Sequence, residues 1–261
     1  MSVFRLVALS LLVSVSALAA GAAHLAFWDE ASFASVTLLP DLTPVPARAD
    51  IVLARLNQRL TAEMLSHFDL FLYVSKADHG PLAQRMYVFQ KQPGGLKLAY
   101  EWTASTGREK VEVNARGRRV ITATPMGYYQ LDAKRMYTQY HSASWDQDMT
   151  SVLFFDWERA GSQTGLAIHA AAPKDVAKLG SRASGGCVHL APDNAAMLYD
   201  LIQANYRGPV PRFAYDHESR TASNRGDFLR DRQGGLRMTE GYRVLVVLED
   251  YGGEDAVAAL F

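Results

Sequence analysis

The first regular pattern of apolar residues along the chain lies between residues 49 and 68. Large apolar side chains recur there at steps of three and four, at Leu53, Leu56, Leu60, Met64 and Phe68. This spacing places them on one face of an amphipathic helix, and Asp50 is a suitable N-cap. We therefore predict an N-terminal helix over residues 49–68 that packs its apolar face against another element.

Most of the remaining apolar runs are short and rich in β-branched and aromatic residues, which is typical of strands. Strands are expected at residues 70–74, 85–89, 96–103, 136–140, 151–155, 166–169 and 242–248. The last run is apolar at nearly every position, so we expect it to be buried on both faces of a sheet. The pattern as a whole predicts a mainly β fold with flanking helices.

Two helices are expected among the later strands. Residues 173–178 predict a short helix, and residues 193–206 predict a longer one with Pro192 and Asp193 in its first turn. The apolar side of the longer helix is expected to carry Ala196, Met197, Leu201 and Ile202. Residues 212–239 then mix arginines with acidic residues, which predicts a solvated polar insertion, with a substrate-facing flap as the alternative.

The first 23 residues have the pattern of an export signal. Arg5 precedes an apolar stretch over residues 6–20, and Ala17 and Ala19 form an A-x-A cleavage pattern. Because no Asp, Glu, Lys or Arg lies between Arg5 and Asp29, an uncleaved membrane anchor is the alternative. Either reading places the domain in the periplasm or elsewhere in the cell envelope, after a proline-containing linker over residues 24–48.

Charge and cysteine content exclude several classes of function. The chain of 261 residues has 27 basic and 27 acidic side chains, so no net positive charge attracts nucleic acid. Its one cysteine, Cys187, excludes an intramolecular disulfide and any multi-cysteine zinc site. His169, Cys187 and His189 lack a fourth ligand candidate, so we expect no metal site.

The candidate chemistry concentrates around this cysteine. His169 ends an apolar strand-like run, and Cys187 follows eighteen positions later in the sequence Ser184-Gly185-Gly186-Cys187-Val188-His189. A histidine that accepts the thiol proton would make the sulfur a nucleophile, and the bare glycine backbone could approach a developing oxyanion. Burial of the cysteine as a small apolar residue is the alternative that composition alone leaves open.

These residues resemble the signature of L,D-transpeptidases with a YkuD-type catalytic domain. In that family a histidine that closes a strand is followed, after a glycine-containing loop, by Ser-His-Gly-Cys-Ile/Val-Arg or a close variant. Further similarity lies upstream, in a strand, a Ser-Thr-Gly turn and a Thr-Pro-x-Gly-aromatic segment, and downstream in the strand after the cysteine helix. The matching residues are 85–89, 105–107, 124–129 and 208–210.

The resemblance implies a YkuD-like β-sandwich or barrel over residues 69–250, including the insertion at 212–239 and followed by a tail at 251–261. It implies that Cys187 is the nucleophile, that His169 is the general base and acid, and that the Ala170 carbonyl orients His169. Gly186 and Cys187 would supply oxyanion-hole amides, and Ser184 would support the loop. The substrates would be donor and acceptor stem peptides of peptidoglycan, joined through a thioester after release of D-alanine. The resemblance implies no cofactor for this reaction.

Two positions depart from the family pattern. Gly185 stands where most members have histidine, and His189 stands where many have arginine, whose five donors an imidazole cannot replace. Both are kept as candidates for loop or substrate support. The alternatives are an L,D-carboxypeptidase or amidase that uses water as acceptor, and an inactive peptidoglycan-binding module whose loop has decayed.

Overall fold

The computed structural model describes residues 47–218, 220–222 and 224–254, so the expected export signal and most of the linker lie outside the described residues. The helices are α1 (Arg48–Arg59), α2 (Ala62–His67), the 3-10 helix η1 (Pro173–Lys178) and α3 (Pro192–Asn205). The strands are β1 (Leu70–Ser75), β2 (Arg85–Gln92), β3 (Gly95–Ser105), β4 (Val111–Val113), β5 (Arg119–Ile121), β6 (Gly127–Tyr129), β7 (Leu131–Ser142), β8 (Gln147–Phe155), β9 (Glu158–Arg159), β10 (Ser162–Gln163), β11 (Ala167–Ala170), β12 (Val188–Leu190), β13 (Arg207–Pro211), β14 (Tyr215–Asp216), β15 (Thr221–Ala222), β16 (Met238–Tyr242) and β17 (Val244–Glu249). The expected mainly β fold with flanking helices is confirmed.

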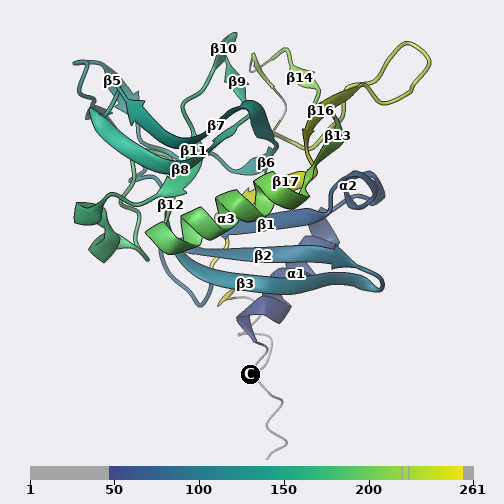
Figure 1. The fold of residues 1–261 in the computed structure, drawn as a ribbon, viewed down its shortest axis with the longest axis horizontal. Helices are drawn as coiled ribbons and strands as arrows, with labels where there is room; N and C mark the ends of the chain where they lie inside the picture. Colours follow the sequence, from purple (N-terminus) through teal and green to yellow (C-terminus); the bar gives the residue numbers. More distant parts are fainter. Residues whose placement is uncertain (1–46, 219, 223, 255–261) are drawn as a thin grey trace, which may run out of the picture. The chain divides into compact units, whose positions relative to one another are not determined.

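A curled sheet of nine strands forms the body of the fold, in the order β6-β17-β1-β2-β3-β12-β11-β8-β7. β6 and β7 lie at opposite ends of this order, yet only Gln130 separates them in the sequence. The sheet must therefore curl until its two edges approach each other, as Figure 1 shows. Most neighbouring strands are antiparallel, but β1 pairs with β17 and β11 with β12 in parallel.

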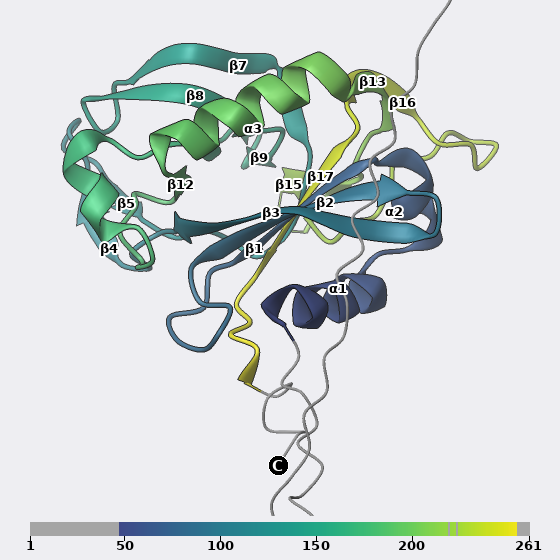
Figure 2. The same ribbon diagram turned by 60° about the horizontal axis from the view of Figure 1, so that its bottom comes forward.

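Two apolar cores lie on opposite faces of the central strands. In β1, Leu70, Leu72 and Val74 point into the core shared with α3, whereas Phe71 and Tyr73 point into the core shared with α1. Figure 2 shows these two helices on opposite sides of β1, β2 and β3. Because side chains alternate along a strand, burial on both faces produces the continuous apolar run seen in the sequence. The same holds for β17, where all six residues are buried as expected.

The segment predicted as one N-terminal helix forms two helices. Leu60 has an extended backbone and ends α1, and Thr61 caps α2 by accepting a hydrogen bond from the Met64 N–H at 3.1 Å. The apolar spacing continues across this break, so periodicity alone did not reveal it. Asp50 lies in the first turn of α1, and the N-cap is Ala47.

The buried face of α3 agrees with the expected one at Ile202 and is rotated from it elsewhere. Ala195, Leu198, Tyr199 and Ile202 are its buried residues, whereas Met197 is exposed. The buried residues follow the i, i+3, i+4, i+7 spacing of one helix face, and the Tyr199 ring packs in the core. None of the helices in the described part of the chain is long and apolar enough to cross a membrane.

The polar insertion at 212–239 is anchored to the body by aromatic packing. The rings of Phe213 and Phe228 stack with their centroids 5.3 Å apart, and the Phe228 ring also packs against the Phe68 ring with centroids 6.3 Å apart. Arg230 forms an ion pair with Glu63 of α2 at 2.7 Å. Beyond the insertion, the expected tail begins with residues that still pack on the fold, since Tyr251 contacts the α1 core.

Candidate active site

A cavity of about 660 Å³ contains the side chains that the sequence singles out. His169 lies on β11 and pairs in register with His189 on the parallel strand β12, and Cys187 directly precedes β12. Residues in register, and residues two apart on one strand, point to the same face of a sheet. The two imidazoles and the thiol therefore share one face, and all three line the cavity.

The His169 ring is held in one orientation by its neighbour. Its Nδ1 lies 2.8 Å from the Ala170 carbonyl oxygen, and only 2% of the residue is exposed. Because a carbonyl only accepts hydrogen bonds, Nδ1 carries the proton and Nε2 keeps its lone pair in the neutral ring. Burial lowers the pKa of His169 to about 3, with a further lowering by His189, so the neutral ring is the resting form.

His189 places a second imidazole beside the first, with ring centroids 4.5 Å apart. Burial lowers the pKa of His189 to about 4, opposed by Asp175 and assisted by Arg108. Two neutral rings can lie this close without the repulsion that two imidazolium ions would suffer. The low pKa values of His169 and His189 therefore agree with their packing.

The Cys187 thiol is half-buried in the cavity, and its sulfur lies 3.5 Å from the Gly165 carbonyl oxygen. Burial raises the pKa of Cys187 to about 11, against a lowering by a backbone hydrogen bond from Ala167. The resting site thus holds a neutral thiol and a neutral imidazole. A proton must leave the sulfur during attack, which is a task for a general base.

The loop before the cysteine is organised by the Ser184 hydroxyl. Ser184 Oγ accepts a hydrogen bond from the Gly186 N–H at 3.0 Å and donates one to the Cys187 carbonyl at 2.5 Å. The expectation that the Gly186 amide supplies an oxyanion donor meets a difficulty here, because this N–H already has an acceptor. The Cys187 N–H is the stronger candidate donor.

Gly185 lies against the indole of Trp145, in the turn between β7 and β8. A Cβ on Gly185 would come within 2.7 Å of the Trp145 ring, and the Arg108 guanidinium lies over that ring at 5.7 Å from its centroid. Trp145 also lines the cavity. The position that carries histidine in most family members is therefore covered by an indole from another part of the chain.

Other cavity residues carried no signal that singled them out. Lys174, Asp175 and Lys178 line the cavity together with Arg108. Charged residues in loops and in a short helix are usually solvated, so sequence reasoning had no ground to select them. In the described part of the chain, no group of three or more His, Cys, Asp or Glu side chains is arranged to hold a metal ion.

Comparisons with known proteins identify the catalytic domain family. The model of the L,D-transpeptidase catalytic domain, YkuD, matches residues 71–233. No curated protein matches the chain.

Similar solved structures include an L,D-transpeptidase from Mycobacterium smegmatis (15% identity, TM-score 0.38, 70% of this chain and 59% of that one). Others are the L,D-transpeptidase from Xylanimonas cellulosilytica (18% identity, TM-score 0.37, 75% of this chain and 68% of that one) and the helical cell shape determining protein Pgp2 from Campylobacter jejuni (13% identity, TM-score 0.36, 72% of this chain and 52% of that one). The chain thus spans about half to two thirds of the length of these structures. From the match over residues 71–233, the chain belongs to the L,D-transpeptidase catalytic domain (YkuD) family.

Proposed function

We propose that this protein is a peptidoglycan L,D-transpeptidase, with Cys187 as nucleophile and His169 as general base and acid. One observation carries the proposal. The thiol of Cys187 and the imidazole of His169 line the same cavity, and the Ala170 carbonyl holds His169 in the tautomer whose Nε2 can accept a proton. A cavity of about 660 Å³ also has room for a peptide ligand.

The acylation step balances within this group of residues. The sulfur attacks the carbonyl carbon at the L,D bond of the donor stem as its proton passes to His169, and the carbonyl oxygen becomes an oxyanion facing the Cys187 N–H. Collapse of this intermediate breaks the C–N bond, and the imidazolium returns the proton to the leaving amine of D-alanine. A thioester on Cys187 remains.

The second half-reaction determines the product. An amine of an acceptor stem attacks the thioester and gives its proton to His169. The C–S bond then breaks to leave the amide cross-link, and the imidazolium returns the proton to the sulfur, which regenerates the thiol. The cationic side chains Arg108, Arg116 and Lys174 line the cavity and are suited to carboxylates of the stem peptides. Peptidoglycan lies outside the cytoplasm, which agrees with an exported protein in the cell envelope. The reaction requires no cofactor.

The test incubates purified full-length protein with a defined disaccharide tetrapeptide and resolves the products by mass. New cross-linked dimers with release of D-alanine support the proposal, and Cys187→Ala and His169→Asn should abolish them. Tripeptide without dimer would instead indicate a carboxypeptidase that uses water. Unchanged tetrapeptide with a folded wild-type protein that retains it would indicate a binding module.

A further inference from the structure

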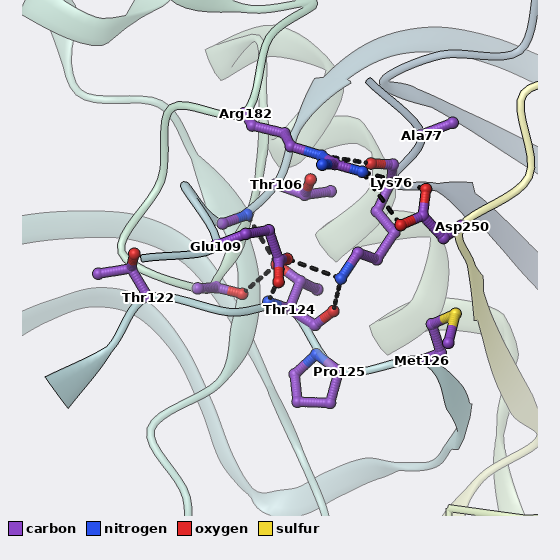
Figure 3. Close-up of polar contacts among 12 residues, drawn as sticks. Lys76, Ala77, Thr106, Glu109, Thr122, Thr124, Pro125, Met126, Arg182 and Asp250 are labelled. Carbon is purple, nitrogen blue, oxygen red and sulfur yellow. Dashed lines mark hydrogen bonds and ion pairs between the residues drawn. The ribbon is translucent and has the colours of Figure 1, made fainter. Parts of the chain in front are cut away.

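An ion pair lies behind the Ser184–Cys187 loop, outside the cavity. Lys76 follows β1 directly, and its side chain is only 8% exposed. Its Nζ is 2.7 Å from Glu109 Oε1 and 2.9 Å from the Thr124 carbonyl oxygen, as Figure 3 shows. Burial of a charged ammonium is costly unless it is paired and hydrogen-bonded, so this arrangement requires an explanation.

Both backbone polar groups of Thr124 are bound by this pair. The Thr124 carbonyl accepts from Lys76, and the Thr124 N–H donates to Glu109 Oε1 at 3.1 Å. Glu109 makes this contact from a left-handed backbone conformation with φ of 56°, which is unfavourable for a residue other than glycine. The strained conformation persists where the surrounding contacts hold it in place.

The Thr124 hydroxyl transmits this constraint to the cysteine loop. It accepts a hydrogen bond from the Gly107 N–H at 2.8 Å, and it donates its own proton to the Gly186 carbonyl at 2.7 Å. A hydroxyl has a single proton to donate, so the Gly186 carbonyl receives it. Thr124 itself is fully buried.

The Gly186 carbonyl and the Cys187 N–H belong to the same peptide unit. A trans peptide is planar, and its C=O and N–H point in opposite directions. The hydrogen bond from Thr124 therefore fixes the direction of the Cys187 N–H, which points away from Thr124. Gly186 has φ of 129°, and a Cβ there would lie 2.9 Å from the Ala123 carbonyl oxygen, so only glycine fits this position.

We infer that Lys76, Glu109 and Thr124 are positioning residues for the oxyanion donor. The ion pair fixes the backbone of Thr124, the Thr124 hydroxyl fixes the Gly186–Cys187 peptide, and that peptide presents the Cys187 N–H to the oxyanion. This inference rests on the proposed function. It assigns these residues an effect on the rate of acyl transfer and none on the reactivity of the sulfur itself.

Two reactions at the same sulfur separate these effects. A carbapenem such as imipenem acylates the thiol when the sulfur bonds to the β-lactam carbonyl carbon, the ring C–N bond breaks and the thiol proton passes to the ring nitrogen. This route forms an oxyanion. Iodoacetamide alkylates the same sulfur by displacement of iodide and forms no oxyanion. Because Cys187 is the chain's one cysteine, intact mass follows both reactions without ambiguity.

The central variant is Thr124→Val, which removes the hydroxyl and keeps the shape of the side chain. We expect the first-order acylation constant for imipenem to fall by about tenfold to a hundredfold, below the loss seen when an oxyanion donor is deleted outright. The half-saturating imipenem concentration and the alkylation rate should both stay within about twofold of the wild-type values. Thr124→Ser should restore acylation because it restores the hydroxyl.

Glu109→Gln tests the ion pair with less risk to folding, and we expect a smaller decrease in acylation of about threefold to tenfold. The matched control is Thr122→Val. Thr122 is equally buried and lies two residues away, but its hydroxyl donates to the Lys110 carbonyl. This control should leave both reactions near the wild-type rates.

Three results would overturn the inference. Acylation of Thr124→Val and Glu109→Gln at the wild-type rate would show that Thr124 does not govern the donor. A parallel loss of acylation and alkylation would show general damage to the loop. Failure of folded wild-type protein to react with imipenem, while iodoacetamide still labels it, would overturn the proposed function together with this inference.

Discussion

Acidification should destabilise this fold because two imidazoles are buried beside the thiol. The pKa of His169 is lowered to about 3 and that of His189 to about 4, against 6.5 for an ordinary histidine. Between these values and pH 6.5, the unfolded chain binds protons that the folded chain does not. Stability from these two sites is therefore complete above pH 6.5 and is lost as the pH falls through this window.

The magnitude follows from the proton balance. At pH 5 both folded sites remain neutral, whereas an unfolded histidine is almost fully protonated. Each buried imidazole therefore lowers the free energy of unfolding by about 2 kcal/mol between pH 7.5 and pH 5. This follows because pH 5 lies about 1.5 units below the unfolded pKa and one unit corresponds to about 1.4 kcal/mol. Both sites together give about 4 kcal/mol, a large part of the stability of a typical domain. The result depends mainly on the unfolded pKa, because both folded values lie below pH 5.

Urea unfolding at pH 7.5 and pH 5, followed by tryptophan fluorescence, measures this difference. The decrease in unfolding free energy between the two pH values should be about 2 kcal/mol smaller in His189→Gln than in the wild type. His169→Asn should show a similar reduction. If either variant retains the full wild-type decrease, its imidazole is not a buried neutral group and the argument for that residue fails.

Other consequences of the structure can be tested in the same way. Gly185→Ala should displace the Trp145 indole and lower stability by about 1–2 kcal/mol, whereas Gly165→Ala, whose Cβ would meet open space, should be close to neutral in the same thermal melts. Thr61→Ala removes the cap of α2 and should cost about 1 kcal/mol in urea unfolding, with Thr61→Ser as the control that keeps the hydroxyl. Phe228→Ala, which removes a ring packed on Phe68 and Phe213, should cost about 3 kcal/mol; a loss below 1 kcal/mol would mean that the insertion is not anchored there. Since burial raises the pKa of Cys187 to about 11, its alkylation by iodoacetamide should still rise with pH above 9, where an ordinary thiol reaches a plateau; a plateau near pH 9 would contradict this burial.

The strands that are buried on both faces could be predicted from the sequence. The runs that became β1 and β17 are apolar at nearly every position, and the structure buries each of them between two cores. The break between α1 and α2 was missed because the apolar spacing runs through Leu60 and Thr61 without interruption. The buried face of α3 is rotated from the predicted one, although its buried residues keep the i, i+3, i+4, i+7 spacing of a helix. Only at the break between α1 and α2 did the extended Leu60 backbone and the Thr61 cap decide what periodicity could not.

The candidate site shows a different limit. A signature within one stretch of sequence brought Ser184, Cys187 and His189 to attention, because those residues are neighbours in the chain. Lys76, Glu109 and Thr124 come from three separate segments, and their relation exists only once β1 and the loops beyond β3 have packed.

Gly185 illustrates the same limit from the opposite side. In the sequence it reads as the absence of a family histidine and so as a sign of decay. In the folded chain the lack of a side chain is required by Trp145, forty residues earlier, whose ring occupies the space that a Cβ would need. A local sequence motif cannot show that a side chain missing at one position is replaced in space by a side chain from another part of the chain. The missing histidine alone therefore does not indicate that the loop has lost its catalytic function, because the Trp145 ring fills the space beside Gly185.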